Sequence, residues 1–299
     1  MRPLARESRR VQAAILNADD FGLSQSANQA IIRAHVEGML ASASLMVNEP
    51  AAVDAVRLAR GHPGLDVGLH LVLSCGASAL GATALRAITG PDGRFPQSPA
   101  VAGIRAYFLA GARRQARQEV RAQFQRFAAT GLPCTHCNGH QHLHLHPVVW
   151  DQALAGCEEL GVPWIRIPHE EWVPHEGHGT MGQRLERTFF AVLRRRCLRT
   201  LRGRPMRTAD RVYGHLATGR MDPDYVAALA ARLRGRVNEI YLHPGTPHAR
   251  PSPRVPGIDV ELEALVSPKV REAFARNGVA LVSFSRAGAA GREELPWRG

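Results

Sequence analysis

Short runs of apolar residues alternate with longer segments of helical periodicity along most of the chain. Apolar runs of strand length predict buried β-strands, and apolar positions at a spacing near 3.6 predict helices. We predict strands over 11–17, 42–48, 66–74, 134–140, 164–168, 211–217, 239–245 and 279–285. Helices are predicted over 24–37, 50–60, 147–160, 182–201, 222–233 and 267–277, together with a long polar helix that ends near Ala129.

This repeated order of strand and helix favours parallel pairing of the strands with helices on the outside. Seven or eight such units predict an α/β fold with a single TIM-like (β/α) barrel, either complete or distorted and incomplete. A doubly wound open sheet is the alternative. No linker or fixed repeat divides the chain, so we expect one domain over 1–299, with flexible tails at 1–10 and 287–299 and a Gly/Pro-rich loop at 76–99.

Composition adds limits to this picture. Hydrophobic residues make up 45% of the chain, enough for a full core. No run of 18 apolar residues is present, and residues 1–10 lack the apolar middle of a secretion signal, so a cytoplasmic location is expected. The five cysteines argue against a disulfide framework, because their number is odd and the expected compartment is reducing.

The net charge of +12 raises the question of nucleic acid or anionic lipid as a partner. Much of the surplus lies over 184–211, where ten arginines meet only two acidic residues. Apolar residues recur there at helical spacing, which describes a basic amphipathic helix able to rest on the inner face of an anionic membrane. A solvated outer helix of the barrel is the favoured reading. No module with interleaved aromatic residues points to nucleic acid.

Polar residues that can carry chemistry follow the predicted strands. Asp19 and Asp20 end the first strand, His70 lies near the end of the third, His140 ends the fourth, and His243 ends a later one. In parallel barrels the active site forms from these strand ends and the loops after them. We therefore expect these side chains to meet at one rim.

The Asp19–Asp20 pair has two readings. Adjacent carboxylates after an apolar strand repel each other unless a cation or hydrogen bonds offset the cost. One can bind a metal while the other accepts a proton. Alternatively, they cap the following helix.

Histidines recur at every second residue over 140–146. In an extended segment this spacing places all four imidazoles on one side, and imidazole is a common zinc ligand. The alternatives are a solvated loop or a tag-like tract. Taken alone, His70 would be interpreted as a core histidine. The other candidate ligands favour its interpretation as a metal ligand. Cys134 and Cys137 match a zinc or redox pair, but on a strand they face opposite ways, which favours a structural or incidental role.

These motifs resemble those of the YdjC-like (ChbG) carbohydrate deacetylases. The stretch 17–24, Asn-Ala-Asp-Asp-Phe-Gly-Leu-Ser, is similar to the opening motif of the family. Gly68-Leu69-His70 looks like its second motif, and 135–144 resembles its histidine-rich motif. Residues 68–73, 92–95, 140–147 and 164–168 are most similar to the hopanoid-biosynthesis branch of the family, called HpnK.

The resemblance implies a metal-dependent N-deacetylase acting on an acetylated amino sugar, with N-acetylglucosaminyl hopanoid as the substrate in the hopanoid branch. It implies Asp19 as general base, His243 as general acid, and Asp20, His70 and His140 as ligands of one divalent metal ion. Zinc and magnesium both occur in the family, and one carboxylate with two imidazoles favours zinc.

The sequence departs from the family motif at two positions. Asn138 stands where the family has aspartate, so an orienting carboxylate is expected to be lost there. Gln141 interrupts the family's three consecutive histidines. Neither departure removes a proposed ligand.

Three other functions remain open at this point. A soluble chito-oligosaccharide deacetylase would perform the same reaction on another carrier. A metal-dependent phosphoesterase could use similar ligands, and a barrel without catalysis could bind membranes or nucleic acid.

Overall fold

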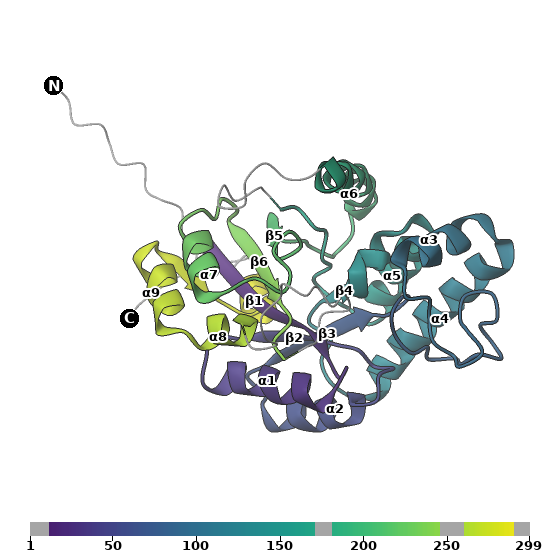
Figure 1. Cartoon of the computed structure of the whole chain (residues 1–299), viewed down its shortest axis with the longest axis horizontal. Coiled ribbons are helices and arrows are strands. Elements are labelled where there is room, and N and C mark those ends of the chain that lie inside the picture. Colours follow the sequence, from purple (N-terminus) through teal and green to yellow (C-terminus); the bar gives the residue numbers. More distant parts are fainter. Residues whose placement is uncertain (1–11, 171–180, 246–259, 290–299) are drawn as a thin grey trace.

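A computed structural model describes residues 12–170, 181–245 and 260–289. Strands and helices alternate through these segments, as the apolar pattern predicts (Figure 1). The strands are β1 (Gln12–Phe21), β2 (Ser42–Leu45), β3 (Asp66–Leu71), β4 (Cys137–Gly139), β5 (Arg211–Tyr213), β6 (Val237–Leu242) and β7 (Val279–Leu281). The expected tail at 1–10 and residues 290–299 of the other lie outside the described residues, whereas 287–289 belong to a helix.

The helices surround the sheet. They are α1 (Gln25–Val36), α2 (Ala52–Gly61), α3 (Pro99–Phe108), α4 (Ala110–Ala129), α5 (Pro147–Glu159), α6 (Met181–Leu201), α7 (Pro223–Ala230), α8 (Val260–Val266), α9 (Pro268–Arg276) and α10 (Phe284–Ala289), with a 3₁₀ segment η1 (His140–Leu145). Of these, α8, α10 and η1 are absent from the sequence prediction, and the last strand ends at Leu281, before the expected residue 285. The Ser24 hydroxyl caps α1 by accepting a hydrogen bond from the Ala27 amide at 3.1 Å, which agrees with the predicted start of this helix at residue 24.

All strand pairs of the sheet are parallel, in the order β4-β3-β2-β1-β6-β5. The long strand β1 is central. Strand β7 pairs with its first residues, and β2 pairs with its last ones. The sheet curls into a half-barrel surrounded by helices, a distorted TIM-like barrel. The α/β barrel prediction is therefore confirmed in its incomplete form.

The gap between β4 and β5 is spanned by the segment 164–169, where a strand was expected. The segment makes only isolated bridges, from Ile165 to Cys137 of β4, from Trp164 to Arg207 and from His169 to Val212 of β5. Its main chain donates from Arg166 to Cys137 at 2.9 Å, and Ile165 donates to Arg207 at 2.8 Å. The strand prediction is wrong because each bridge ends after one residue, but the segment still carries its side chains into the barrel.

The expected long helix before residue 129 is two helices. Leu109 has an extended conformation (ψ 116°) that ends α3 and starts α4 in a new direction.

The loop over 76–98 is fixed by hydrogen bonds to two buried carboxylates. Glu49 accepts from the Ala77 amide at 2.6 Å, and Glu119 accepts from the Ala79 amide at 2.6 Å. The loop is therefore anchored to the helix layer.

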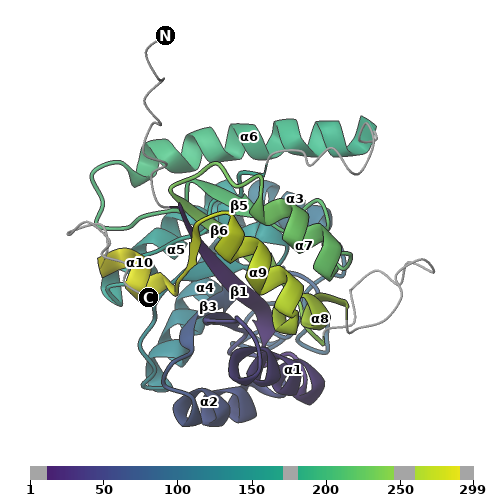
Figure 2. The same ribbon diagram turned by 90° about the vertical axis from the view of Figure 1, so that its left-hand side faces the viewer.

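Helix α6 lies across the outside of the molecule (Figure 2). Among its described side chains, Cys197 and Leu201 are buried, and Phe190, Leu193 and Leu198 are partly buried against the core. Its apolar side is therefore turned toward the protein, as expected for an outer helix of the barrel. No helix of the described residues is long and apolar enough to cross a membrane.

Candidate metal and catalytic site

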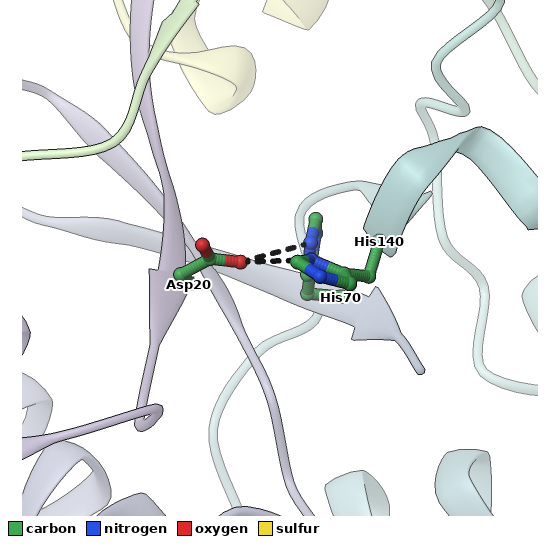
Figure 3. A group of neighbouring side chains, drawn as sticks. All are labelled: Asp20, His70 and His140. Carbon is green, nitrogen blue, oxygen red and sulfur yellow. Dashed lines mark hydrogen bonds and ion pairs between the residues drawn. The ribbon is translucent and has the colours of Figure 1, made fainter. Parts of the chain in front are cut away.

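Three of the predicted residues meet at the carboxyl ends of neighbouring strands (Figure 3). Asp20 ends β1, His70 lies in β3, and His140 follows β4. Asp20 Oδ1 lies 3.1 Å from His140 Nδ1 and 3.4 Å from His70 Nε2. One ligand atom from each residue falls within 4.8 Å of the others, so the three groups can bind one ion together.

Strand register explains why residues so distant in sequence meet. His70 pairs with Asn138 across β3 and β4, which leaves His140 just beyond the sheet on the same edge. Asp20 has a positive φ of 65°, a conformation that aspartate adopts more readily than most residues. This turn of the backbone ends the regular pairing of β1 at the rim.

The environment of His70 fits a metal ligand. Its Nδ1 lies 2.6 Å from Asn138 Oδ1, while the amide Nδ2 of Asn138 donates to Ser44 Oγ at 2.8 Å. His70 Nδ1 must therefore donate, which leaves a lone pair on Nε2. Nε2 is buried, makes no hydrogen bond with another described residue, and faces the Asp20 carboxylate. The Nε2 lone pair and the Asp20 carboxylate repel each other, and a cation bound between them would remove this repulsion.

Asn138 thus keeps the role whose loss was expected. An orienting partner on the second ring nitrogen is what a metal-binding histidine usually has, and a carbonyl oxygen serves as well as a carboxylate.

The charges of Asp20 and His140 stabilise each other. Burial raises the pKa of Asp20, but His140 holds that pKa well below its usual value. Burial lowers the pKa of His140, and the Asp20 carboxylate raises it to above its usual value. Positive charge next to Asp20 is therefore favourable, and a divalent cation would supply it.

Asp19 is held by an arginine that sequence reasoning did not select. Arg166 Nη1 donates to Asp19 Oδ2 at 2.5 Å and Nη2 donates to Oδ1 at 2.9 Å, while Nε donates to Glu239 at 2.7 Å. All three side chains are buried. Despite burial, which opposes ionisation, Arg166 holds the pKa of Asp19 well below its usual value. Asp19 is therefore a carboxylate at neutral pH.

Arg166 and Glu239 each carry a charge inside an apolar strand-like run. That placement was the available signal for both residues, because a buried charge needs a partner. The residues next to Arg166 and Glu239 in the sequence do not identify that partner, because these two residues and Asp19 come from three separate segments. Arg166 also packs over the Tyr241 ring, with Cζ 4.2 Å from the ring centroid.

His243 follows β6 and is held by a carboxylate from α8. Its main-chain amide donates to Glu261 at 2.5 Å, and its Nδ1 lies 3.6 Å from the same oxygen. Burial lowers the pKa of His243, but Glu261, Asp20 and Asp19 together raise it to about 9. The imidazole is therefore protonated at neutral pH. Glu261 was missed because the sequence prediction contained no helix over 260–266.

The other three histidines of the 140–146 run do not join the site. Positive φ angles at Gln141 (52°) and His142 (58°) turn the chain, so the expected extended segment with all imidazoles on one side is wrong. His142 Nε2 bonds to the Tyr241 hydroxyl at 3.0 Å, and His144 Nε2 bonds to the Arg166 carbonyl at 2.8 Å. His146 caps α5. These three side chains therefore bind to other parts of the fold and to none of the proposed metal ligands.

Cys134 and Cys137 lie outside the candidate site. The group of possible metal ligands found in the described part of the chain contains neither thiol. Burial raises the pKa of both thiols, so they are protonated and unreactive at neutral pH.

Comparison with known proteins yields a consistent set of relatives. The model of the family described as YdjC-like protein matches residues 13–276. A carbohydrate deacetylase of Mus musculus is 32% identical over 300 residues, which cover 90% of this chain and 93% of that protein. A chitooligosaccharide deacetylase of Serratia marcescens is 35% identical over 158 residues, covering 52% of this chain and 60% of that protein. This chain thus spans little more than half the length of several bacterial relatives that it matches.

The fold has a counterpart among solved structures. A crystal structure from Enterococcus faecalis V583, described as a cellobiose-phosphate cleavage protein, matches with a TM-score of 0.70 at 22% identity. The match covers 93% of this chain and 99% of that one, so the two share the fold.

Proposed function

The chain belongs to the YdjC-like protein family, and on that premise we propose that it is a metal-dependent hydrolase that removes the acetyl group of an acetylated amino sugar. The observation that carries the proposal is the lone pair of His70 Nε2, which faces Asp20 and His140 without a hydrogen-bond partner among the described residues. The deacetylase names of the relatives support the reaction class. We also propose that the chain is a single domain.

In this proposal Asp20, His70 and His140 hold one divalent ion. The donor set of one carboxylate and two imidazoles favours zinc over magnesium. A bound ion of this kind supplies Lewis-acid polarisation of a carbonyl oxygen and lowers the pKa of water.

The protein's own groups would move the protons. Asp19 is the proposed general base. Its two bonds to Arg166 fix the direction of the carboxylate but also lower its affinity for a proton. We therefore expect proton transfer to Asp19 to depend on how closely Arg166 holds it. His243, protonated and held by Glu261, is the proposed general acid that gives its proton to the departing amine.

We propose N-acetylglucosaminyl hopanoid as the substrate, on the resemblance of residues 68–73, 92–95, 140–147 and 164–168 to the hopanoid branch. The second candidate is a soluble chito-oligosaccharide, which the Serratia marcescens relative favours. Both substrates present the same N-acetyl group, so the site alone does not separate them.

The test is acetate release from N-acetylglucosaminyl hopanoid and, in parallel, from N,N′-diacetylchitobiose, each with and without a chelator. Chelator-sensitive release from the lipid alone would support the full proposal. Release from chitobiose alone would move the enzyme to soluble sugars. Protein that binds zinc and releases acetate from neither would contradict the deacetylase proposal, and phosphate release from phosphoester substrates would then be measured.

A further inference from the structure

Helix α3 exposes its large apolar side chains and buries its small ones. Phe108 is 74% exposed and Ile104 is 59% exposed, and Val101, Tyr107 and Leu109 are exposed as well. Val101, Ile104 and Phe108 follow each other at spacings of three and four, so they form one stripe along the helix. Most globular proteins bury such a stripe, and an exposed apolar cluster usually marks a binding surface.

The inner side of α3 carries the small residues of the helix. Ala102, Gly103 and Ala106 face an apolar pocket that the helix shares with Leu143 and His146. Tyr107 stacks edge-on with the His146 ring at a centroid distance of 6.0 Å. The helix is thus seated on η1 through its small residues, and the stripe is left facing outward.

Exposed arginines lie on α3 and near the start of α4. Arg105 on α3 and Arg113, Arg114 and Arg117 on α4 are all exposed. The sequence contains no acidic residue between Asp92 and Glu119, and Glu119 is buried. Among the described residues, none of these four arginines forms an ion pair with a carboxylate. Arg113 donates a hydrogen bond to the Tyr107 carbonyl, so its charge is also not neutralised by a carboxylate. Exposed apolar side chains next to arginines without a carboxylate partner suit the acyl chains and headgroups of an anionic lipid surface.

We propose that α3 docks this protein on an anionic lipid bilayer, with Val101, Ile104 and Phe108 entering the interface and the arginines meeting lipid headgroups. This replaces α6 as the membrane contact, because most of the described apolar side chains of α6 pack on the core and Val192 alone among its described large apolar residues is exposed. A second copy of the chain fits the face poorly. A two-fold dimer through α3 would bring the arginines of both copies together, and like charges repel.

Docking through α3 places the candidate site next to the membrane. The helix packs on η1, and η1 begins at the proposed ligand His140. A lipid-linked sugar could then reach the rim without leaving the bilayer. This use of the face rests on the proposed function, whereas docking itself requires neither substrate nor metal.

The test is sedimentation of the full chain with vesicles of phosphatidylcholine, with and without phosphatidylglycerol. The double variant Ile104→Ser and Phe108→Ser should bind anionic vesicles at least about tenfold more weakly, because it loses the two most exposed apolar groups of α3. The matched control is Val53→Ser with Val36→Ser, which removes exposed apolar groups of α1 and α2 and should bind like the unchanged protein. All substituted side chains are exposed, so melting temperatures should agree.

Charge is tested separately. Arg114→Gln with Arg117→Gln should weaken binding to anionic vesicles only, and added salt should act in the same way. Equal binding of the serine variant and the unchanged protein would overturn the proposal. Binding without any preference for anionic vesicles would also overturn it. So would a dimer of the unchanged protein in sedimentation equilibrium, if the serine variant is monomeric. None of these measurements depends on acetate release. A negative result for vesicle binding can therefore be distinguished from a negative result for the proposed reaction.

Discussion

Replacing Arg166 with methionine should strongly destabilise the barrel. Arg166 is buried between two carboxylates, Asp19 and Glu239, and donates hydrogen bonds to both at 2.5–2.9 Å. Methionine fills a similar volume but leaves two buried carboxyl groups without a counter-charge. Since burial disfavours the charged form, either the folded state keeps unpaired charges or it must take up protons.

The expected loss follows from this geometry. Removing one partner of a buried ion pair costs about 3–5 kcal/mol of unfolding free energy. At about 2.1 cal/mol/K of unfolding entropy per residue, a chain of 299 residues should then melt roughly 5–8 °C lower. Arg57→Met is the matched control, because Arg57 pairs with Asp54 at the surface with 71% of its side chain exposed. Such pairs contribute about 0–1 kcal/mol, so the control should melt close to the unchanged protein.

The assay is thermal unfolding followed by circular dichroism, with a chelator present so that metal binding does not add stability. Without Arg166, burial raises the pKa of both carboxyl groups above their unfolded values. The stability of the protonated forms is present at low pH and is lost as pH rises through the raised pKa. The deficit of Arg166→Met should therefore be smaller near pH 5 than near pH 8.

A triple variant checks the cause. Arg166→Met combined with Asp19→Asn and Glu239→Gln removes all three charges, and it should recover most of the lost stability. A melting temperature of Arg166→Met within about 2 °C of the unchanged protein would refute the reasoning, since a loss that small corresponds to about 1 kcal/mol or less. A deficit that did not depend on pH would refute it as well.

Three further predictions concern the proposed reaction. Asp19→Asn should still bind zinc in calorimetry but lose acetate release, and near-normal turnover would remove Asp19 as the base. Asn138→Leu should weaken zinc binding by about 10–100-fold, because the His70 ring loses its orienting partner; unchanged affinity would mean that another group orients the ring. Glu261→Gln should move the alkaline limb of the pH–rate profile to lower pH, because His243 must be protonated to act and loses the carboxylate that raises its pKa. An alkaline limb that stays in place would exclude His243 as the titrating acid.

Local pattern was sufficient for the strands and for the candidate ligands. Apolar runs followed by helical periodicity specify strand–helix units, and parallel pairing brings the carboxyl ends of all strands to one edge. Asp20, His70 and His140 end or follow three such strands, so their meeting could be predicted without coordinates.

The same reasoning failed where backbone conformation changes at single residues. An alternating run of histidines is typical of an extended segment, yet Gln141 and His142 adopt positive φ angles. His142 is held there by Tyr241 of β6, a contact across 99 positions of the chain. No spacing rule contains that contact, so the run was assigned to the wrong conformation.

The sequence by itself determined the barrel class and the rim on which the candidate ligands meet, because both depend on short-range periodicity and on the fixed direction of parallel strands. Only the tertiary structure decided how the buried charges are paired. Arg166 joins Asp19 to Glu239, and Glu261 supports His243, across separations that range from 18 to 147 positions in the chain. The reason is physical: a charge in a low-dielectric interior is stabilised by whichever opposite charge the fold brings near, and the distance between them in space does not follow from their distance in sequence.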